Sequence, residues 1–366
     1  MIRIVTLPGD GVGPEVTAQA VQCLVLLSEQ RGLGLTFEER DFGGCAIDAH
    51  GEPLPQATLD ACAASDGVLL GAVGGDKWDD AKVRPEAGLL RLRQELGLFA
   101  NLRPARVMRG LEDASPLRAD LSRDCDVLVV RELTGGIYFG EHKLEVDQAS
   151  DVCAYSRFEI ERIAHAAFRA ARQRRRKVTS VDKANVLATS KLWRSVVTEV
   201  AAGYPDVELN HMYVDACAMA LVTGPRQFDV IVTENMFGDI LSDELSVISG
   251  SIGLLGSASI DGNHGPGLFE PIHGSAPQIA GLDIANPSGA IASAVMLLVE
   301  LGMADSGHIL ADALERTIAD GCRTADIGGT ARCSEFGARV REVLVEQLGR
   351  HDAYRELIAM NRGCCG

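Results

Sequence analysis

The stretch IRIVTLPGDGVGPEVTAQAVQCLVLL, residues 2–27, holds the pattern from which the fold class follows. Its first six residues form an apolar run of strand length, and Pro14 stands where a helix would begin. Proline suits a first helical position because its missing N–H is not needed there. The predicted helix carries on one face the apolar residues Val16, Ala20, Cys23, Leu24 and Leu27. A strand that leads directly into a helix predicts an α/β unit.

The same alternation continues along the chain. Short apolar runs predict further buried strands at residues 68–70, 127–130, 178–181 and 230–232. Helix-period patterns predict helices at residues 158–177, 185–201 and 290–301. Because strands and helices alternate, we expect an α/β protein whose largely parallel sheet is covered by helices.

Length and composition narrow the class of protein. A chain of 366 residues is too long for one small core, which predicts two domains or lobes. Hydrophobic residues make up 46% and charged residues 23%, so the chain is globular rather than disordered. The 35 basic and 51 acidic residues give a formal net charge of −16. That balance excludes nucleic acid or an anionic membrane surface as the main partner, because both need a basic footprint.

Neither a membrane span nor a targeting segment is visible. The two longest uncharged stretches, residues 245–260 and 284–299, fall short of the ~18 apolar residues that a span requires. The N-terminus enters a strand-like pattern at once and lacks the basic and apolar regions of a signal peptide. We therefore expect a cytoplasmic protein.

Ten cysteines are spread over the chain without a CxxC pair. This spacing argues against a zinc site or a disulfide framework and favours free thiols in a reducing compartment. The adjacent Cys364 and Cys365 are expected to lie at an exposed, frayed end.

The segment GDGVGPEV, residues 9–16, follows a strand and precedes a helix. Its glycine spacing is GxGxG rather than GxGxxG, and no acidic residue ends a second strand at the right distance. As a dinucleotide-binding fingerprint the signal is weak. We expect a glycine turn that lets a ligand approach the helix, not a Rossmann site.

A candidate metal site lies in NMFGDILSDELS, residues 235–246. Asp239 and Asp243 are four residues apart, so both carboxylates share one face of a predicted helix. Carboxylate oxygens without histidine or cysteine nearby favour magnesium or manganese. The alternative is a solvated acidic helix face that also includes Glu244.

Basic and aromatic residues indicate a site for a dicarboxylate. Arg93 and Arg103 flank the segment RLRQELGLFANLRP, and Arg131 stands at a predicted strand end, where α/β proteins bind ligands. Arginine forks bind carboxylates bidentately, although each arginine alone is more often a partner in a surface ion pair. Tyr138 and Lys183 are candidate proton-transfer groups; the alternatives are a core tyrosine and a lysine paired with Asp182.

The segment EPIHGSAPQIAGLDIANP, residues 270–287, is polar, rich in small residues and long for a loop. Long ordered loops tend to be functional. Its backbone amides are expected to wrap a flat ligand such as adenine.

Taken together, these segments resemble the isocitrate/isopropylmalate (β-decarboxylating) dehydrogenase family, in its isopropylmalate branch. The likeness runs almost end to end, through LPGDGVGPEV, GAVGGDKW, RPEAGLLRLRQELGLFANLRP, RELTGGIYFG, SVDKANVL, HMYVDA, FGDILSDE, HGSAPQIAG and IANP. It implies an α/β fold of the isopropylmalate dehydrogenase type, in which two lobes share one twisted mixed sheet, rather than a Rossmann fold. Residues 1–98 and 251–366 would form a discontinuous coenzyme-binding lobe. Residues 99–250 would form the lobe for substrate, metal and dimerisation.

The resemblance also implies a role for each candidate residue. Tyr138 would be the general acid and Lys183 of the partner subunit the general base. Magnesium or manganese would be bound by Asp239 and Asp243 together with Asp215 of the partner subunit. The substrate would be bound by Arg93, Arg103, Arg131, Asp215, Glu86, Leu89, Leu90 and Val186, with the two leucines as an apolar wall. NAD would be bound by Gly75, Glu86, His273, Gly274, Ser275, Ala276, Pro277, Gln278, Ile279 and Asn286.

The activity implied by the resemblance is the NAD-dependent oxidative decarboxylation of (2R,3S)-3-isopropylmalate to 4-methyl-2-oxopentanoate in leucine biosynthesis, by a homodimer. One alternative is a paralogue that acts on another 3-alkyl- or 3-arylmalate in a specialised pathway. Another is a catalytically silent binding paralogue, against which the retained acid, base and metal positions argue. Gln278 stands where NAD-dependent members usually carry aspartate, so we expect a preference for NAD with weakened discrimination against NADP.

Overall fold

The computed structural model describes residues 1–79, 83–262 and 265–363, and side chains as far as residue 349. Cys364 and Cys365 lie outside the described residues. The eight cysteines within them are free thiols, as predicted. Among the described residues, no helix is both long enough and apolar enough to cross a membrane.

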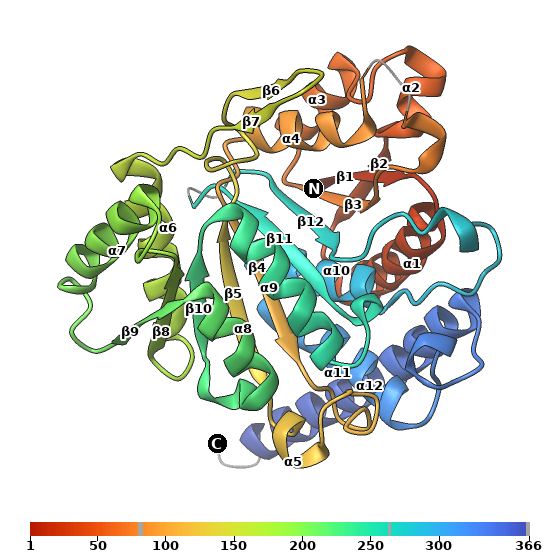
Figure 1. The fold of residues 1–366 in the computed structure, drawn as a ribbon. Helices are drawn as coiled ribbons and strands as arrows, with labels where there is room; N and C mark the ends of the chain where they lie inside the picture. Colours follow the sequence, from red (N-terminus) through yellow and green to blue (C-terminus); the bar gives the residue numbers. More distant parts are fainter. Residues whose placement is uncertain (80–82, 263–264, 364–366) are drawn as a thin grey trace.

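One ten-stranded mixed sheet runs through the whole molecule (Figure 1), which confirms the predicted fold class. The strands lie in the order β2 (Leu35–Glu39), β1 (Ile2–Gly9), β3 (Gly67–Ala72), β12 (Gly267–Pro271), β11 (Gly256–Ile260), β4 (Ala100–Arg106), β5 (Asp126–Glu132), β10 (Val230–Thr233), β8 (Lys177–Asp182) and β9 (Glu208–Tyr213). Three adjacent pairings in the centre, β12–β11, β11–β4 and β4–β5, are antiparallel, and the other six are parallel. Strands from residues 1–98 and 251–366 occupy one half of this order, and strands from residues 99–250 the other.

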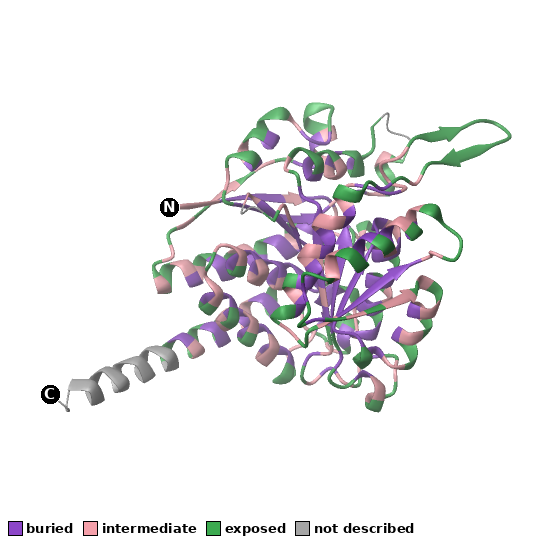
Figure 2. Cartoon of the chain, turned by 90° about the vertical axis from the view of Figure 1, so that its left-hand side faces the viewer, coloured by how far each residue is buried: buried purple, intermediate pink, exposed green. Residues whose placement is uncertain are grey.

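Helices pack on the sheet, and a separate two-stranded ribbon projects from it. The helices are α1 (Gly13–Arg31), α2 (Gly44–His50), α3 (Gln56–Ala63), α4 (Pro85–Glu95), α5 (Ala119–Ser122), α6 (Arg157–Arg172), α7 (Ala188–Ala201), α8 (Val214–Thr223), α9 (Asn235–Ile248), α10 (Ser288–Glu300), α11 (Ala304–Ala319) and α12 (Cys333–Gly363). The ribbon consists of β6 (His142–Leu144) and β7 (Ala149–Asp151). Every residue of these two strands is exposed, whereas buried strands fill the interior (Figure 2).

Two predicted helices begin or end at other residues than expected. The helix expected over 158–177 ends at Arg172, because Arg176 adopts a left-handed φ of 60° that reverses the chain into β8. Arg174 stabilises this turn by ion pairs with Asp126 and Asp229. The helix expected from residue 185 begins at Ala188, because the amides of residues 186 and 187 both donate to the carbonyl of Lys183 in a turn.

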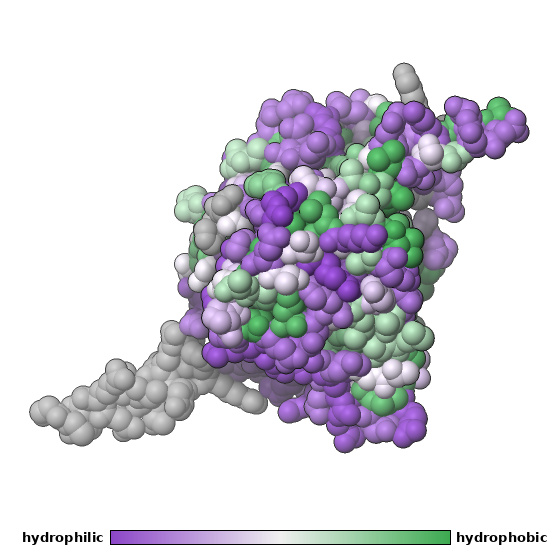
Figure 3. Space-filling view, turned by 60° about the vertical axis from the view of Figure 1, so that its left-hand side comes forward, coloured by the Kyte–Doolittle hydropathy of each residue, from purple (hydrophilic) through white to green (hydrophobic). Residues whose placement is uncertain are grey.

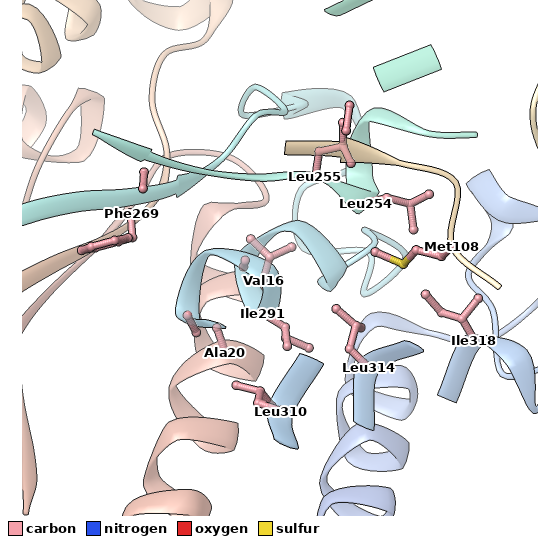
Figure 4. Close-up of a cluster of buried hydrophobic side chains, with 14 of the residues drawn as sticks. Val16, Ala20, Met108, Leu254, Leu255, Phe269, Ile291, Leu310, Leu314 and Ile318 are labelled. Atoms are coloured by element: carbon pink, nitrogen blue, oxygen red, sulfur yellow. The ribbon is translucent and has the colours of Figure 1, made fainter. Parts of the chain in front are cut away.

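Strand β5 shows how the sheet divides the core. Val127 and Val129 point into the largest apolar cluster, whereas Leu128 and Val130 point into a second cluster beneath α6 and α7. Successive side chains of a strand point to opposite faces, so a strand buried on both faces is a continuous apolar run. Figure 4 shows part of the larger cluster, where Val16 of α1 lies among side chains from α10 and α11.

The glycine turn after β1 contacts the loop that follows β12. Gly11 has a φ of 59°, and a Cβ atom there would overlap the carbonyl oxygen of Ser275. The amide of Val12 donates to the same oxygen at 2.8 Å. At Gly11 the turn therefore packs against a segment of the chain itself, and it fixes the loop that follows β12.

A buried carboxyl group stands directly before α9. Glu234 is 6% exposed, and its Oε2 accepts a hydrogen bond of 3.8 Å from the Cys153 thiol. Burial raises the pKa of the Glu234 carboxyl from 4.5 to about 7. The folded state thus holds its proton more tightly than the unfolded chain does.

The first prediction concerns stability against pH. Between pH 4.5 and 7 the unfolded chain ionises at Glu234 before the folded protein does, so the free energy of unfolding falls as pH rises. The loss should be on the order of 3 kcal/mol by pH 8, because each pKa unit corresponds to about 1.4 kcal/mol. Glu234→Gln should remove this contribution, measured by urea unfolding at pH 5 and pH 8. The exposed Glu29→Gln serves as control, and equal slopes in all three proteins would contradict the prediction.

Candidate active site

Strand alternation places the two central arginines on one face of the sheet. Arg131 ends β5 on the same face as Val127 and Val129, and Arg103 of β4 is paired directly with Val129. Helix α9 packs across both strands on this face (Figure 1) and presents Asp239 and Asp243 to them. The prediction that both carboxylates share a helix face is therefore confirmed.

The Asp239 carboxylate is the point at which the cluster converges. Its Oδ1 accepts from the Nη1 atoms of Arg131 and Arg103, the latter at 3.3 Å. Its Oδ2 accepts from the Tyr138 hydroxyl at 3.2 Å. Asp243 lies one turn further along α9, with its Oδ1 3.6 Å from Arg103. The predicted acid, two predicted substrate arginines and two predicted metal ligands thus lie together.

Burial sets the electrostatics of this cluster. Arg131 is 4% exposed, and burial, followed by the charge of Arg103, lowers its pKa to about 10. Burial likewise lowers the pKa of Arg103 and raises that of Asp243. Burial and the negative charge of Asp239 raise the pKa of the Tyr138 hydroxyl. Two adjacent buried guanidinium groups favour an anionic ligand, and the phenol keeps its proton at neutral pH.

The third predicted arginine lies at the end of α4. Arg93 is 7% exposed and forms an ion pair with Glu270 of β12 through Nη2. Its Nε is buried without a hydrogen-bond partner, so one donor remains for a ligand acceptor. The charges of Arg93 and Glu270 both influence the pKa of Arg103.

Lys183 and Asp215 form an ion pair with each other, away from the arginine cluster. The first follows β8 and the second opens α8 after β9, so both lie at the carboxyl edge of the parallel strands. Asp182 pairs instead with Arg194, so the alternative of an Asp182–Lys183 pair is wrong. Val186 is 65% exposed beside them. No group of three or more His, Cys, Asp or Glu side chains that could hold a metal ion occurs within the described part of the chain.

The predicted coenzyme loop borders a pocket of about 360 Å³. Its walls include Val12, Ile252, His273, Ala276, Ile279 and Asn286. His273 Nδ1 lies 2.9 Å from the carbonyl of Gly274, which can only accept, so Nδ1 carries the hydrogen. Burial lowers the pKa of this imidazole, and its Nε2 is a buried acceptor without a partner. Asn286 is held by Asp326 at 3.0 Å.

The remaining predicted positions lie around this loop and α4. A Cβ atom at Gly75 would be 3.9 Å from the ring of Pro277, and one at Gly74 would be 2.6 Å from the Glu86 carboxylate. The structure therefore brings the start of α4 to the coenzyme loop. Leu89 packs partly into the apolar cluster beneath α4, whereas Leu90 is half-buried and outside that cluster. Gln278 and Gly274 are exposed, and Ser275 is buried.

The sequence analysis missed three polar residues of the site. Asn235 accepts from Arg131, Ser242 accepts from Arg103 at 2.7 Å, and Glu270 binds Arg93. Asn235 and Ser242 belong to the motif that carries the two aspartates. They stand four residues before and three residues after Asp239, so both lie on its helix face, and this spacing was the available signal. Glu270 had no such signal, because its partner is 177 residues away.

Comparisons with known proteins identify the family of the chain. The model of the family described as isocitrate/isopropylmalate dehydrogenase matches residues 3–340. The 3-isopropylmalate dehydrogenase of Anaeromyxobacter dehalogenans is 57% identical over 89% of this chain and 95% of its own. That of Staphylococcus saprophyticus is 53% identical over 93% and 99%.

Solved structures show the same architecture. The isocitrate dehydrogenase of Methylococcus capsulatus superposes with a TM-score of 0.85 at 35% identity, over 94% of this chain and 99% of its own. A β-decarboxylating dehydrogenase of Thermococcus kodakarensis superposes with a TM-score of 0.79 at 37% identity, over 95% and 98%. On the match to the family model, on its curated relatives and on its fold, the chain belongs to the isocitrate/isopropylmalate dehydrogenase family.

Proposed function

We propose that this protein is an NAD-dependent enzyme that oxidatively decarboxylates 3-isopropylmalate to 4-methyl-2-oxopentanoate in leucine biosynthesis. The observation that carries the proposal is the convergence of Arg103, Arg131 and Tyr138 on Asp239. A buried pair of arginines can bind the carboxylates of such a substrate, and a protonated phenol beside them can act as an acid. The curated relatives named for this activity support the choice of substrate.

The donor set fits a divalent metal. Asp239 and Asp243 project from successive turns of α9, and their side chains are 35% and 57% exposed, so ligand positions remain accessible. Hard carboxylate oxygens suit magnesium or manganese. We propose that Asp215 of the partner subunit completes the ligand set, since the chain's own Asp215 is paired with Lys183 at the edge of the sheet.

The pocket beside the coenzyme loop fits an adenine base. Apolar walls from Val12, Ile252 and Ile279 suit a flat ring, and the unpartnered Nε2 of His273 can accept from an exocyclic amino group. Gly75 lies beside Pro277 of this loop, and Glu86 stands on α4, the helix that also carries Arg93; we propose that the nicotinamide half of the coenzyme binds along these residues.

The roles of the chain's own residues follow from the electrostatics. Arg93, Arg103 and Arg131 bind and orient the two substrate carboxylates. Lys183 of the partner subunit accepts the hydroxyl proton, and Tyr138 donates a proton to the carbon that loses its carboxylate. When bound, NAD would supply the hydride acceptor, and a metal held by Asp239 and Asp243 would supply a Lewis acid for the oxygen of the reacting carbon. Leu89, Leu90 and Val186 are proposed to contact the alkyl group.

We propose that the chain divides into two lobes, residues 1–98 with 251–366 and residues 99–250. The two sets of strands occupy separate halves of the sheet, and they meet at the β11–β4 pair. Arg93 and Glu270 belong to the first proposed lobe, and Asp239 belongs to the second, so the proposed site lies where the two lobes meet.

A homodimer with shared sites is the proposed active unit. Helices α8 and α9 expose Met219, Val222, Ile240 and Val247, which are 64%, 45%, 59% and 55% accessible. Figure 3 shows that apolar side chains on this side of the molecule gather in patches among polar ones. Such patches mark association surfaces. The exposed β6–β7 ribbon offers a second surface for pairing.

The activity predicts a direct assay. NADH should form with 3-isopropylmalate and magnesium faster than with malate, a bulkier alkylmalate or isocitrate. Tyr138→Phe should lower kcat by roughly two orders of magnitude or more, because a general acid is lost. Preference for the bulkier alkylmalate would favour the specialised paralogue, and preference for isocitrate would overturn the substrate. Absence of turnover with all four hydroxy acids would refute the proposed enzymatic activity.

Shared sites predict complementation. Lys183→Ala and Asp239→Ala homodimers should each be inactive, whereas a mixture that exchanges subunits should regain part of the activity. In a mixed dimer, one site combines an intact Asp239 with the intact lysine of the other chain. Activity is measured before and after mixing, with a mixture of two Asp239→Ala preparations as control. A fully active monomer in sedimentation would contradict the proposal.

Gln278 predicts a relaxed coenzyme preference. The exposed amide keeps one acceptor for a ribose hydroxyl but lacks the charge that would repel a 2′-phosphate. Gln278→Asp should raise the ratio of kcat/KM for NAD over NADP by about one or two decades, since a charge-assisted bond contributes roughly 1.5–3 kcal/mol. An unchanged ratio would mean that residue 278 does not contact the ribose. A wild-type ratio below one would overturn the choice of NAD.

A further inference from the structure

The first residue of α9 joins three parts of the site. Asn235 is 1% exposed, and its Oδ1 accepts from Nε and Nη2 of Arg131 at 3.0 and 2.7 Å. Its Nδ2 donates to the carbonyl oxygens of Leu133 and Gly135, each at 3.2 Å. One amide thus binds the guanidinium at the end of β5 and the backbone of the loop that leads to Tyr138.

Tyr155 supports the same loop from beneath. Its hydroxyl accepts from the backbone amide of Asn235 at 2.9 Å, which satisfies a free N–H at the start of α9. A Cβ atom at Gly135 would lie 2.6 Å from the Tyr155 ring, and Gly136 has a φ of 80°. The loop backbone can therefore lie directly on the ring only because both positions are glycine.

We propose that Asn235 is a positioning residue that holds Arg131 and the Tyr138 loop in register with the helix that carries Asp239 and Asp243. This inference rests on the proposed function, because that function assigns substrate binding to Arg131 and proton donation to Tyr138. Asn235 acts through Arg131 and Tyr138 and does not itself need to touch the substrate.

The chemistry of the amide explains why this position requires asparagine. The Arg131 fork needs an acceptor, and the two loop carbonyls need donors, at a position that is buried from water, since Asn235 is 1% exposed. Aspartate supplies only acceptors, and alanine supplies neither. Loss of either half leaves buried polar groups without partners, which shifts the loop or the arginine rather than merely weakening α9.

Two variants separate the two halves of this role. Asn235→Asp keeps the acceptor for Arg131 but removes the donor to the two loop carbonyls. Asn235→Ala removes both the acceptor and the donor. Ser249→Ala is the matched control, because Ser249 is buried at the other end of α9 and bonds only the carbonyl of Leu245 in its own helix.

The first measurement is hydrogen exchange of residues 134–140 in the protein without substrate. Both Asn235 variants should increase exchange in this segment about tenfold or more, because the loop loses two buried hydrogen bonds, while Ser249→Ala leaves it unchanged. Increased exchange spread evenly over the whole chain would indicate general destabilisation and overturn the proposal. Should Asn235→Ala fail to fold, Asn235→Asp and Tyr155→Phe supply the same comparison.

The second measurement is the split between KM values. Asn235→Ala should raise KM for the hydroxy dicarboxylate about ten- to hundredfold, because Arg131 loses two charge-assisted hydrogen bonds, and leave KM for NAD unchanged. Asn235→Asp should raise KM for the hydroxy dicarboxylate less than Asn235→Ala does, because it keeps an acceptor for Arg131. A global loss of stability would not raise KM for the hydroxy dicarboxylate selectively over KM for NAD. In an Arg131→Lys background the effect of Asn235→Ala should shrink, and full additivity would refute coupling through Arg131.

The two measurements distinguish failure of this inference from failure of the proposed function. If the wild type turns over none of the four hydroxy acids but the Asn235 variants still release the loop, only the proposed function fails. If the wild type is active and the variants change neither loop exchange nor the KM of the hydroxy acid, the positioning role fails.

Discussion

The ion pair between Arg131 and Asp239 is the interaction on which the rest of the site depends. A guanidinium that is 4% exposed cannot remain without an anionic partner, because an unpaired buried charge costs several kcal/mol. The pair therefore ties the end of β5 to α9. It also fixes where Arg103 and Tyr138 find an acceptor, since both bind the same carboxylate. The Arg131–Asp239 contact therefore both stabilises the fold around a buried charge and positions the side chains of the proposed site.

A second constraint acts on the coenzyme side. Gly11 admits the carbonyl of Ser275 at a distance that any side chain would prevent, and the amide of Val12 holds that carbonyl. The loop from β12 is thereby anchored to the turn between β1 and α1. Asp10 anchors the other side of the turn by accepting from the amides of Gly44, Cys45 and Gly74, each at 2.8 Å. The glycines and the aspartate of this motif shape the pocket indirectly, by placing the loop that lines it.

The sheet explains why charged residues can gather in so buried a place. The antiparallel strands β4 and β11 join two parallel halves, so residues from both halves approach one another near the centre. Arg93 with Glu270 comes from one half, and Arg103, Arg131 and Asp239 come from the other. Each of these buried guanidinium groups has a carboxylate partner, as low dielectric surroundings require.

Periodicity and residue spacing are local properties, so the α/β class, the buried strands and the helix that presents Asp239 and Asp243 could be predicted from the sequence. Local pattern also identified Arg103, Arg131 and Tyr138 as candidates. Three-dimensional packing was needed to show that these three residues share one carboxylate, and that Lys183 pairs with Asp215 rather than Asp182. It also showed that Glu270 and Asn235 complete the arginine contacts. It also ended α6 at Arg172, where the chain turns to reach β8. These outcomes depend on partners between about 30 and 180 residues away, and burial rather than local propensity selects among such partners.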